Sequence, residues 1–135
     1  MKLYIGTKII AAEPQEKDGK EGYKVEYEDG YISWSPKDVF ETAYTGLDDG
    51  GMSFGHAIKL LKMGFKVARK GWNGKNQYIE LATNISYVNA DEEVVNCEHD
   101  AIGNKAIAFV GTSGVQMGWL ASQADMLAED WMVVA

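Results

Sequence analysis

Apolar and polar residues alternate in the first third of the chain. Residues 23–27 place apolar side chains at every second position, between charged ones, as a half-buried strand does. Asp29 and Gly30 follow, and this dipeptide favours tight hairpin turns because glycine accepts a positive φ. Residues 31–34 are therefore predicted to return as the second strand of a hairpin.

The segments around this hairpin have weaker patterns. Apolar residues within 3–10 predict an opening strand, and polar residues 13–22 predict a loop. Ser35 is a candidate helix cap, with Pro36 at the first helical position and Asp38 three residues after the cap. The side chains expected to face inward from this short helix are Val39, Phe40 and Ala43.

Helical spacing appears after Ser53, which can cap a second helix. Gly64 lies where a helix favours a left-handed terminal residue. Apolar residues at three- and four-residue spacing give this helix one inward-facing stripe. They are Phe54, Ala57, Ile58, Leu61 and Phe65.

Short strands are predicted for the rest of the chain, at residues 66–69, 77–81, 106–110 and 131–134, with Trp131 in the core. Between them, the polar and acidic residues 83–105 predict an extended loop or an irregular hairpin.

A third helix is predicted to begin at Ser122. Asp125 stands three positions later, as in a capping box. Met126 and Leu127 are expected to pack inward from this helix.

These elements predict an α+β fold of small antiparallel sheets and short helices. We expect an N-terminal module of strands, hairpin and helix at residues 1–45. Three glycines and two aspartates in residues 46–51 are typical of a linker. Residues 52–135 would then form a second domain.

Composition excludes several classes of function. An apolar content of 46% excludes general disorder. The net charge of −7 argues against binding to DNA or RNA polymers, which requires a basic surface. Cys97 is the one cysteine, so no internal disulfide forms, and a reducing cytoplasm is expected. No apolar run approaches the ~18 residues of a membrane span, and no signal peptide is evident at the N-terminus.

Two stretches place a tryptophan beside glycine where a strand-like run meets a turn. They are residues 68–74, with Trp72, and residues 118–131, with Trp119. Small or polar residues flank both side chains, which favours an aromatic platform over a core position. We expect both tryptophans to stack on a flat ligand; the alternative is packing within a protomer or a subunit interface.

Together these stretches resemble the Thoeris anti-defence 2 family of phage proteins. The resemblance spans residues 52–135 and rests on Met52 to Gly55, Val67 to Lys75 and Gly118 to Trp131. It implies a small α+β protomer that forms a homotetramer, with the two motif tryptophans lining a pocket at a protomer interface. It also implies a sponge that acts in the host cytoplasm. Such a sponge sequesters a cyclic nucleotide immune messenger, a cyclic ADP-ribose isomer or a cyclic oligonucleotide, without cleaving it. Residues 1–45 and the acidic stretch 83–105 depart from the compact members of that family.

A cyclic nucleotide presents a purine face, ribose hydroxyls and phosphate charge. Stacking on an aromatic side chain contributes about 1–3 kcal/mol per base. Phosphates favour guanidinium groups and backbone N–H groups. The residues expected to bind the ligand are Trp72, Trp119, Arg69, Asn73, Phe54, Ser122, Gln123 and Asp125.

Several of these residues also have a purely structural interpretation. Arg69 could form a surface ion pair, and Asn73 could simply form a turn. Ser122 and Asp125 form the predicted capping box, and Phe54 begins an apolar helix stripe.

No convincing catalytic or metal-binding set is evident. His56 and His99 lie in no recognised metal-ligand motif, and neither a P-loop nor a nucleophile elbow is present. We expect no cofactor, no metal and no enzyme activity. Two alternatives remain: a small hydrolase of the messenger, with Asp125 or Glu80 as general base, and a protein-interaction module that uses the tryptophans.

Overall fold

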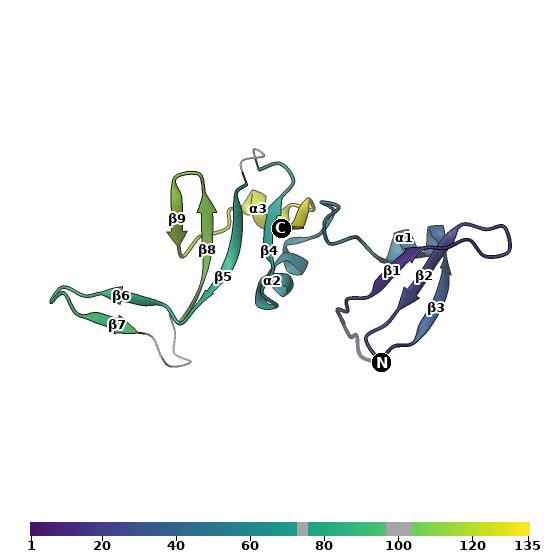
Figure 1. The fold of residues 1–135 in the computed structure, drawn as a ribbon, viewed down its shortest axis with the longest axis horizontal. Coiled ribbons are helices and arrows are strands. Elements are labelled where there is room, and N and C mark those ends of the chain that lie inside the picture. Colours follow the sequence, from purple (N-terminus) through teal and green to yellow (C-terminus); the bar gives the residue numbers. More distant parts are fainter. Residues whose placement is uncertain (73–75, 97–103) are drawn as a thin grey trace. The chain divides into compact units, whose positions relative to one another are not determined.

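The computed structural model describes residues 1–72, 76–96 and 104–135. The chain forms two compact units, Met1–Thr45 and Gly46–Ala135, which we call unit 1 and unit 2 (Figure 1). Small antiparallel sheets and short helices make up both, which confirms the predicted α+β class. Among the described residues, no helix has the length and apolar content needed to cross a membrane.

Unit 1 is a three-stranded antiparallel sheet with one short helix. Its elements are β1 (Ala11–Pro14), β2 (Gly22–Glu26), β3 (Ile32–Pro36) and α1 (Lys37–Ala43), and the strand order is β1-β2-β3. The predicted hairpin is present between β2 and β3, and Gly30 has the expected positive φ of 86°.

Aromatic side chains pack unit 1 together. The ring of Phe40 on α1 stacks on Tyr23 of β2 with centroids 4.1 Å apart, and on Tyr44 at 5.1 Å. The indole N–H of Trp34 donates to the carbonyl of Gln15 at 2.8 Å. Trp34 thus closes the loop between β1 and β2.

Three expectations for unit 1 were wrong. The first strand is Ala11–Pro14, in register with β2, whereas residues 3–10 form no strand and Leu3 is fully exposed. Pro36, not Ser35, is the cap residue of α1, because β3 runs directly into the helix and leaves no side-chain cap. Val39 and Ala43 are exposed, because this seven-residue helix turns the ring of Phe40 toward the sheet and leaves both of them outside.

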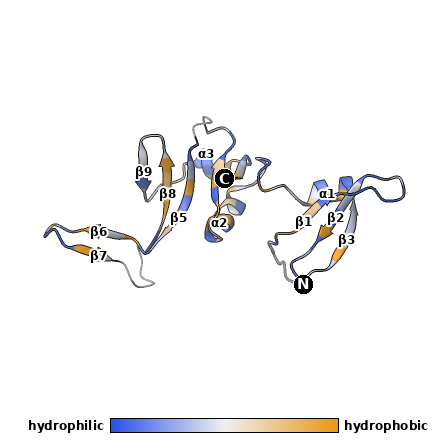
Figure 2. Ribbon diagram, viewed as in Figure 1, coloured by the Kyte–Doolittle hydropathy of each residue, from blue (hydrophilic) through white to orange (hydrophobic). Residues whose placement is uncertain are grey.

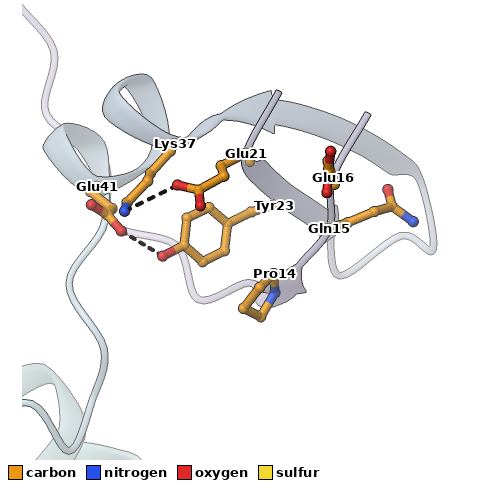
Figure 3. A pocket seen from close by; sticks show the side chains of 8 residues that line it. Pro14, Gln15, Glu16, Glu21, Tyr23, Lys37 and Glu41 are labelled. Carbon is orange, nitrogen blue, oxygen red and sulfur yellow. Dashed lines mark hydrogen bonds and ion pairs between the residues drawn. The ribbon is translucent and has the colours of Figure 1, made fainter. Parts of the chain in front are cut away.

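A polar hollow of about 390 Å³ lies on unit 1 (Figure 3). Two contacts lie along its rim: the Lys37 ammonium lies 3.4 Å from the Glu21 carboxylate, and the Tyr23 hydroxyl donates to Glu41 at 2.6 Å. All four side chains belong to the rim that joins α1 to β2. The hollow is therefore held by its own hydrogen bonds.

Unit 2 contains a five-stranded antiparallel sheet in the order β10-β4-β5-β8-β9. Its elements are α2 (Phe54–Lys62), β4 (Lys66–Arg69), β5 (Tyr78–Thr83), β8 (Lys105–Gly111), β9 (Gly114–Met117), α3 (Gln123–Leu127) and β10 (Trp131–Val134). A separate hairpin, β6 (Ser86–Val88) with β7 (Val94–Asn96), occupies part of the polar stretch. The predicted strands of this half are thus confirmed, and so is the hairpin alternative for residues 86–96; residues 97–103 of the polar stretch lie outside the described residues.

The strand register separates this sheet into two faces. Val67 pairs with Ile79 and Ile79 pairs with Phe109, so these side chains share one face, together with Arg69 and Trp131. Helix α2 packs on that face, which we call the covered face. The intervening residues of each strand point to the opposite, open face.

The core of unit 2 lies between α2 and the covered face. Trp131, Ile79 and Val67 have no exposed surface, and Ala57 and Leu61 of α2 are likewise buried. The core position predicted for Trp131 is confirmed. Leu60 is also buried on α2, outside the predicted stripe.

The ends of α2 follow the sequence pattern. The Ser53 hydroxyl accepts from the backbone N–H of His56 at 3.2 Å, and Gly64 has φ 93°. The apolar residues of α3 do not follow the sequence pattern. Met126 is 41% exposed and Leu127 is 77% exposed, so their predicted inward packing was wrong. A helix of five residues is held here by polar contacts instead.

The glycine-rich segment 46–51 is joined to the sheet of unit 2. The backbone N–H of Val133 donates to the carbonyl of Leu47 at 2.6 Å, and Met52 exchanges two backbone hydrogen bonds with Trp131. The segment therefore runs along the edge strand β10.

Ser53→Ala and Ser35→Ala form a matched pair that tests the two helix starts. Ser53→Ala should lower the free energy of unfolding by about 1 kcal/mol, because the N–H of His56 loses its acceptor. Ser35→Ala should cost less than about 0.5 kcal/mol, because α1 has no side-chain cap. Chemical denaturation of the full chain, followed by circular dichroism, measures both. Equal losses would contradict the capping assignment.

Candidate functional site

Five aromatic rings gather on the covered face of unit 2. We call them the aromatic cluster: Phe54, Trp72, Phe109, Trp119 and Trp131. The Trp72 ring centroid lies 5.3 Å from that of Trp131, 5.4 Å from that of Phe109 and 5.9 Å from that of Trp119. All three contacts are edge-to-face, a favoured geometry for aromatic pairs. The two motif tryptophans therefore meet in space although 47 residues separate them in the sequence.

The cluster is buried at one side and accessible at the other. Trp131 is fully buried, whereas Trp72 and Trp119 are half-buried. Leu120, next to Trp119, is 88% exposed. Trp72 and Trp119 thus pack against the core and keep part of each ring at the surface.

Local backbone geometry fixes the position of each motif tryptophan. Trp72 follows β4 in a tight turn, and its N–H donates to the carbonyl of Arg69 at 3.1 Å. The N–H groups of Gly118 and Trp119 both donate to the carbonyl of Ile107, at 3.1 and 2.9 Å. Gly118 has φ 77°, which a side-chain-bearing residue rarely adopts. The glycine thus allows the chain to turn from β9 toward the cluster.

Arg69 connects three segments beside the cluster. Its Nε donates to the Asp130 carboxylate and its Nη1 to the Asp125 carboxylate, each at 3.0 Å. Arg69 is the last residue of β4, Asp125 lies in α3 and Asp130 precedes β10. These three side chains, which we call the arginine network, are at most about one-third exposed. Such partly desolvated, charge-assisted hydrogen bonds are among the stronger ones in proteins.

Asp125 also closes the first turn of α3. Its carboxylate accepts from the Ser122 N–H at 3.0 Å and from the Ser122 hydroxyl at 2.8 Å, and the Asp125 N–H donates to that hydroxyl oxygen. The predicted capping box is confirmed. The indole N–H of Trp131 donates to the Asp125 carbonyl at 3.0 Å. Asp125 therefore links α3 to Ser122, Arg69 and Trp131.

Burial and hydrogen bonding shift the pKa of Asp125 in opposite directions. Burial raises its pKa, but the hydrogen bonds from Ser122 and Arg69 together outweigh burial and hold the pKa below its usual range. The hydrogen bonds that Arg69 donates to Asp130 and Asp125 raise the pKa of Arg69. The network therefore stabilises the charged forms of Arg69 and Asp125.

The remaining candidates have a simpler environment. Phe54 is the first residue of α2 and contacts Trp131 with ring centroids 5.3 Å apart. Gln123 is the first residue of α3, and it is exposed. Asn73 lies outside the described residues. The structure thus brings Phe54, Arg69, both motif tryptophans, Ser122 and Asp125 to one region of unit 2.

Two residues of this region were missed in the sequence. Phe109 belongs to the cluster: its ring centroid lies 6.3 Å from that of Trp119, and the angle between the two ring planes is 24°. Asp130 accepts a hydrogen bond from Arg69. Strand alternation could have indicated Phe109, which shares a face with Ile79. Asp130 could be found only through the pairing of β10 with β4.

Metal ligands are not grouped in the described part of the chain. No cluster of three or more His, Cys, Asp or Glu side chains suited to a metal ion is found there. Cys97 and His99 lie outside the described residues.

Fold and site together define a small α+β domain with an aromatic surface site supported by an ion-pair network. The family profile of the Thoeris anti-defense 2-like domain matches residues 52–134. The chain is also 38% identical over 89 residues to the Thoeris anti-defense 2 protein of Bacillus phage SP01, covering 62% of this chain and 96% of that protein.

This chain belongs to the Thoeris anti-defense 2-like family. The matched region contains the whole aromatic cluster and the arginine network. Membership supports a phage anti-defence role, and the family name describes that role and no enzyme activity. Unit 1 precedes the matched region.

Asp125→Asn should make unit 2 less stable and less sensitive to acid. The folded-state pKa of Asp125 is depressed, so its contribution is present above the unfolded pKa of about 3.9 and is lost as pH falls through the folded value. At pH 7 the substitution should cost about 1–3 kcal/mol. Between about pH 5 and pH 2 the variant's unfolding free energy should fall less steeply than that of the wild type.

Glu129→Gln is the matched control. Glu129 is exposed, and it makes no ion pair with the described residues. Denaturant unfolding followed by tryptophan fluorescence across this pH range measures both variants. Identical pH profiles for wild type and Asp125→Asn would contradict the role given to the network.

Proposed function

We propose that this protein is a phage anti-defence sponge that binds and sequesters a cyclic nucleotide immune messenger without cleaving it. The messenger would be a cyclic ADP-ribose isomer or a cyclic oligonucleotide, held in the host cytoplasm. Family membership supports the anti-defence role. The observation that carries the binding proposal is the pair of half-buried tryptophans, Trp72 and Trp119, at the accessible side of one aromatic cluster.

The geometry favours stacking as the main source of affinity. Trp72 and Trp119 are held against Phe109 and Trp131, so little conformational entropy is lost when a base docks on them. Two stacks of about 1–3 kcal/mol each contribute a substantial part of the roughly −12 kcal/mol of a nanomolar complex. A rigid aromatic platform thus suits a protein that must hold its ligand and not turn it over.

The arginine network suits hydroxyl groups better than phosphate. It has one positive and two negative charges, so it offers an anion no net attraction. Arg69 uses Nε and Nη1 for the two carboxylates, and its Nη2 hydrogens remain available to a ligand oxygen. We therefore assign Asp125 and Arg69 contacts with ribose in addition to their part in the fold. Asn73, Ser122 and Gln123 complete the proposed polar rim.

The site is proposed to be completed by another copy of the chain. Leu120, which follows the half-buried Trp119 in the chain, is 88% exposed, and Leu127 of α3 is 77% exposed. Large exposed apolar side chains next to an aromatic site are typical of an interface. We propose a homo-oligomer, a tetramer, in which a neighbouring copy covers these residues.

The hydrolase alternative is less well supported by the positions of its two candidate bases. The Asp125 carboxylate accepts hydrogen bonds from Arg69 and Ser122, and its depressed pKa makes it a weak base at neutral pH. Glu80 pairs with Ala108, so it points to the open face, away from the cluster. Binding without cleavage is therefore the better proposal.

Trp72→Ala and Trp119→Ala test the binding proposal. Each should weaken messenger binding by about 5- to 150-fold, the equivalent of one lost stack. Trp34→Phe, in unit 1, is the control and should leave affinity unchanged. Titration calorimetry against cyclic ADP-ribose isomers and cyclic di- and trinucleotides gives the affinities, and near-ultraviolet circular dichroism verifies folding. Wild-type affinity in both alanine variants would contradict the site.

A further inference from the structure

A second hollow of unit 1 is aromatic and apolar, and we call it the tyrosine hollow. Its volume of about 420 Å³ lies in the range of small-ligand sites. Residues 8–10, which precede β1, line one side, and residues 27–29 with Tyr31, in the turn from β2 to β3, line the other. Figure 1 shows the start of the chain beside this turn. Unit 1 precedes the matched residues 52–134, so family membership assigns no role to this hollow.

Two tyrosine rings give the tyrosine hollow an aromatic surface. The rings of Tyr27 and Tyr31 are stacked, with centroids 5.9 Å apart and an angle of 27° between the ring planes. Tyr27 is half-buried, whereas Tyr31 is 64% exposed. The Lys8 ammonium lies 4.9 Å from the centroid of the Tyr27 ring, so that ring already holds a cation. The exposed ring of Tyr31 is therefore the aromatic surface left for a ligand.

The rim of the tyrosine hollow carries more negative than positive charge. Figure 2 shows the turn from β2 to β3 as hydrophilic, next to the hydrophobic start of β3. In this turn, Glu28 makes no hydrogen bond or ion pair with the described residues. The Asp29 carboxylate accepts from the backbone N–H of Tyr31 at 3.0 Å, which holds it at the turn. With Lys8, the rim has one formal positive and two formal negative charges. One bound cation makes the hollow neutral, whereas a phosphate is repelled.

An exposed apolar segment leads into the tyrosine hollow. Ile9 and Ile10 are half-buried in its wall, whereas Leu3, Tyr4 and Ile5 are 90% to 102% exposed. This segment has the residue types of a strand but no register partner. Large apolar side chains exposed next to a hollow are typical of an interaction surface. A free small cation would leave them uncovered, so the segment favours a polypeptide ligand.

We propose that the tyrosine hollow binds an arginine side chain of a partner polypeptide, so that unit 1 is a docking module for a second protein. The guanidinium stacks on the exposed Tyr31 ring and pairs with the Glu28 carboxylate. Its aliphatic stem lies along Ile9 and Ile10. Arginine suits this site better than lysine, because its planar group stacks on aromatic rings and offers two parallel donors to a carboxylate.

The arginine must come from a different protein. Arg69 is the one arginine in the sequence, and its guanidinium is held by Asp125 and Asp130. Another copy of the chain therefore has no free arginine to place in the hollow. The proposal concerns unit 1 alone and is independent of the messenger site in unit 2.

Two tripeptides that differ in one group test the proposal on the full chain. Acetyl-Leu-Arg-Leu-amide carries the guanidinium, and the same peptide with citrulline carries its neutral isostere. Amide chemical shifts of the nitrogen-15-labelled protein are followed during titration. The arginine peptide should shift residues 8–10 and 27–31. It should bind about 3- to 25-fold more tightly than the citrulline peptide, which loses both the cation–ring contact and the charge pair.

Three variants at exposed positions of unit 1 separate these contributions. Glu28→Gln should weaken the arginine peptide by about 1.5- to 5-fold and leave the citrulline peptide unchanged. Tyr31→Leu keeps an apolar side chain and should weaken the arginine peptide by about two- to fivefold. Glu16→Gln, on the polar hollow of the same unit, is the matched control and should alter neither affinity.

Several results would overturn the proposal. Equal affinity for the two peptides would show a hollow that accepts an apolar group without regard to charge. Weakening by Glu16→Gln, or shifts confined to other residues, would place the peptide elsewhere. The absence of any shift at about 10 mM peptide, tenfold above a dissociation constant of about 1 mM, would also overturn it. Messenger affinity should be unchanged in Glu28→Gln, so each of these failures leaves the sponge proposal intact.

Discussion

The candidate site of unit 2 depends on the two hydrogen bonds that Arg69 makes to Asp125 and Asp130. β4 ends at Arg69, α3 is too short to be stable alone, and β10 begins one residue after Asp130. One guanidinium, with its rigid fork of donors, holds all three segments. Without it, α3 would lose its ion pair to the sheet, while Gly118 and Trp119 would stay bonded to the carbonyl of Ile107. The candidate site is therefore held by an ion-pair network as well as by apolar packing.

This dependence explains why Arg69 and Asp125 have both a structural and a functional interpretation. Their charges are compensated inside the fold, and the tryptophans that they position keep ring surface exposed. In a sponge these tasks are compatible, because affinity requires a rigid site and no proton transfer. The same network would be a poor arrangement for general base catalysis, since Asp125 is held in its weakly basic charged form.

Local sequence signals predicted much of the fold but not the contacts between distant segments. The Asp29–Gly30 hairpin, the Ser53 cap and the Ser122 capping box follow from chemistry within four residues. The first strand was predicted too early because apolar content does not reveal which segment finds a register partner. Met126 and Leu127 are apolar yet exposed, because a five-residue helix is oriented by its cap. Trp72 and Trp119 were identified from their motifs, whereas Phe109 and Asp130 emerge only through strand pairing.

The central claim is that this protein retains a messenger intact. The most direct measurement is to incubate the full chain with cyclic ADP-ribose isomers and cyclic oligonucleotides, remove free ligand, denature the protein by heat and identify the released molecule by mass spectrometry. The account predicts an intact cyclic messenger that appears only after heating. A cleaved product, or no bound molecule from the whole panel, would contradict it.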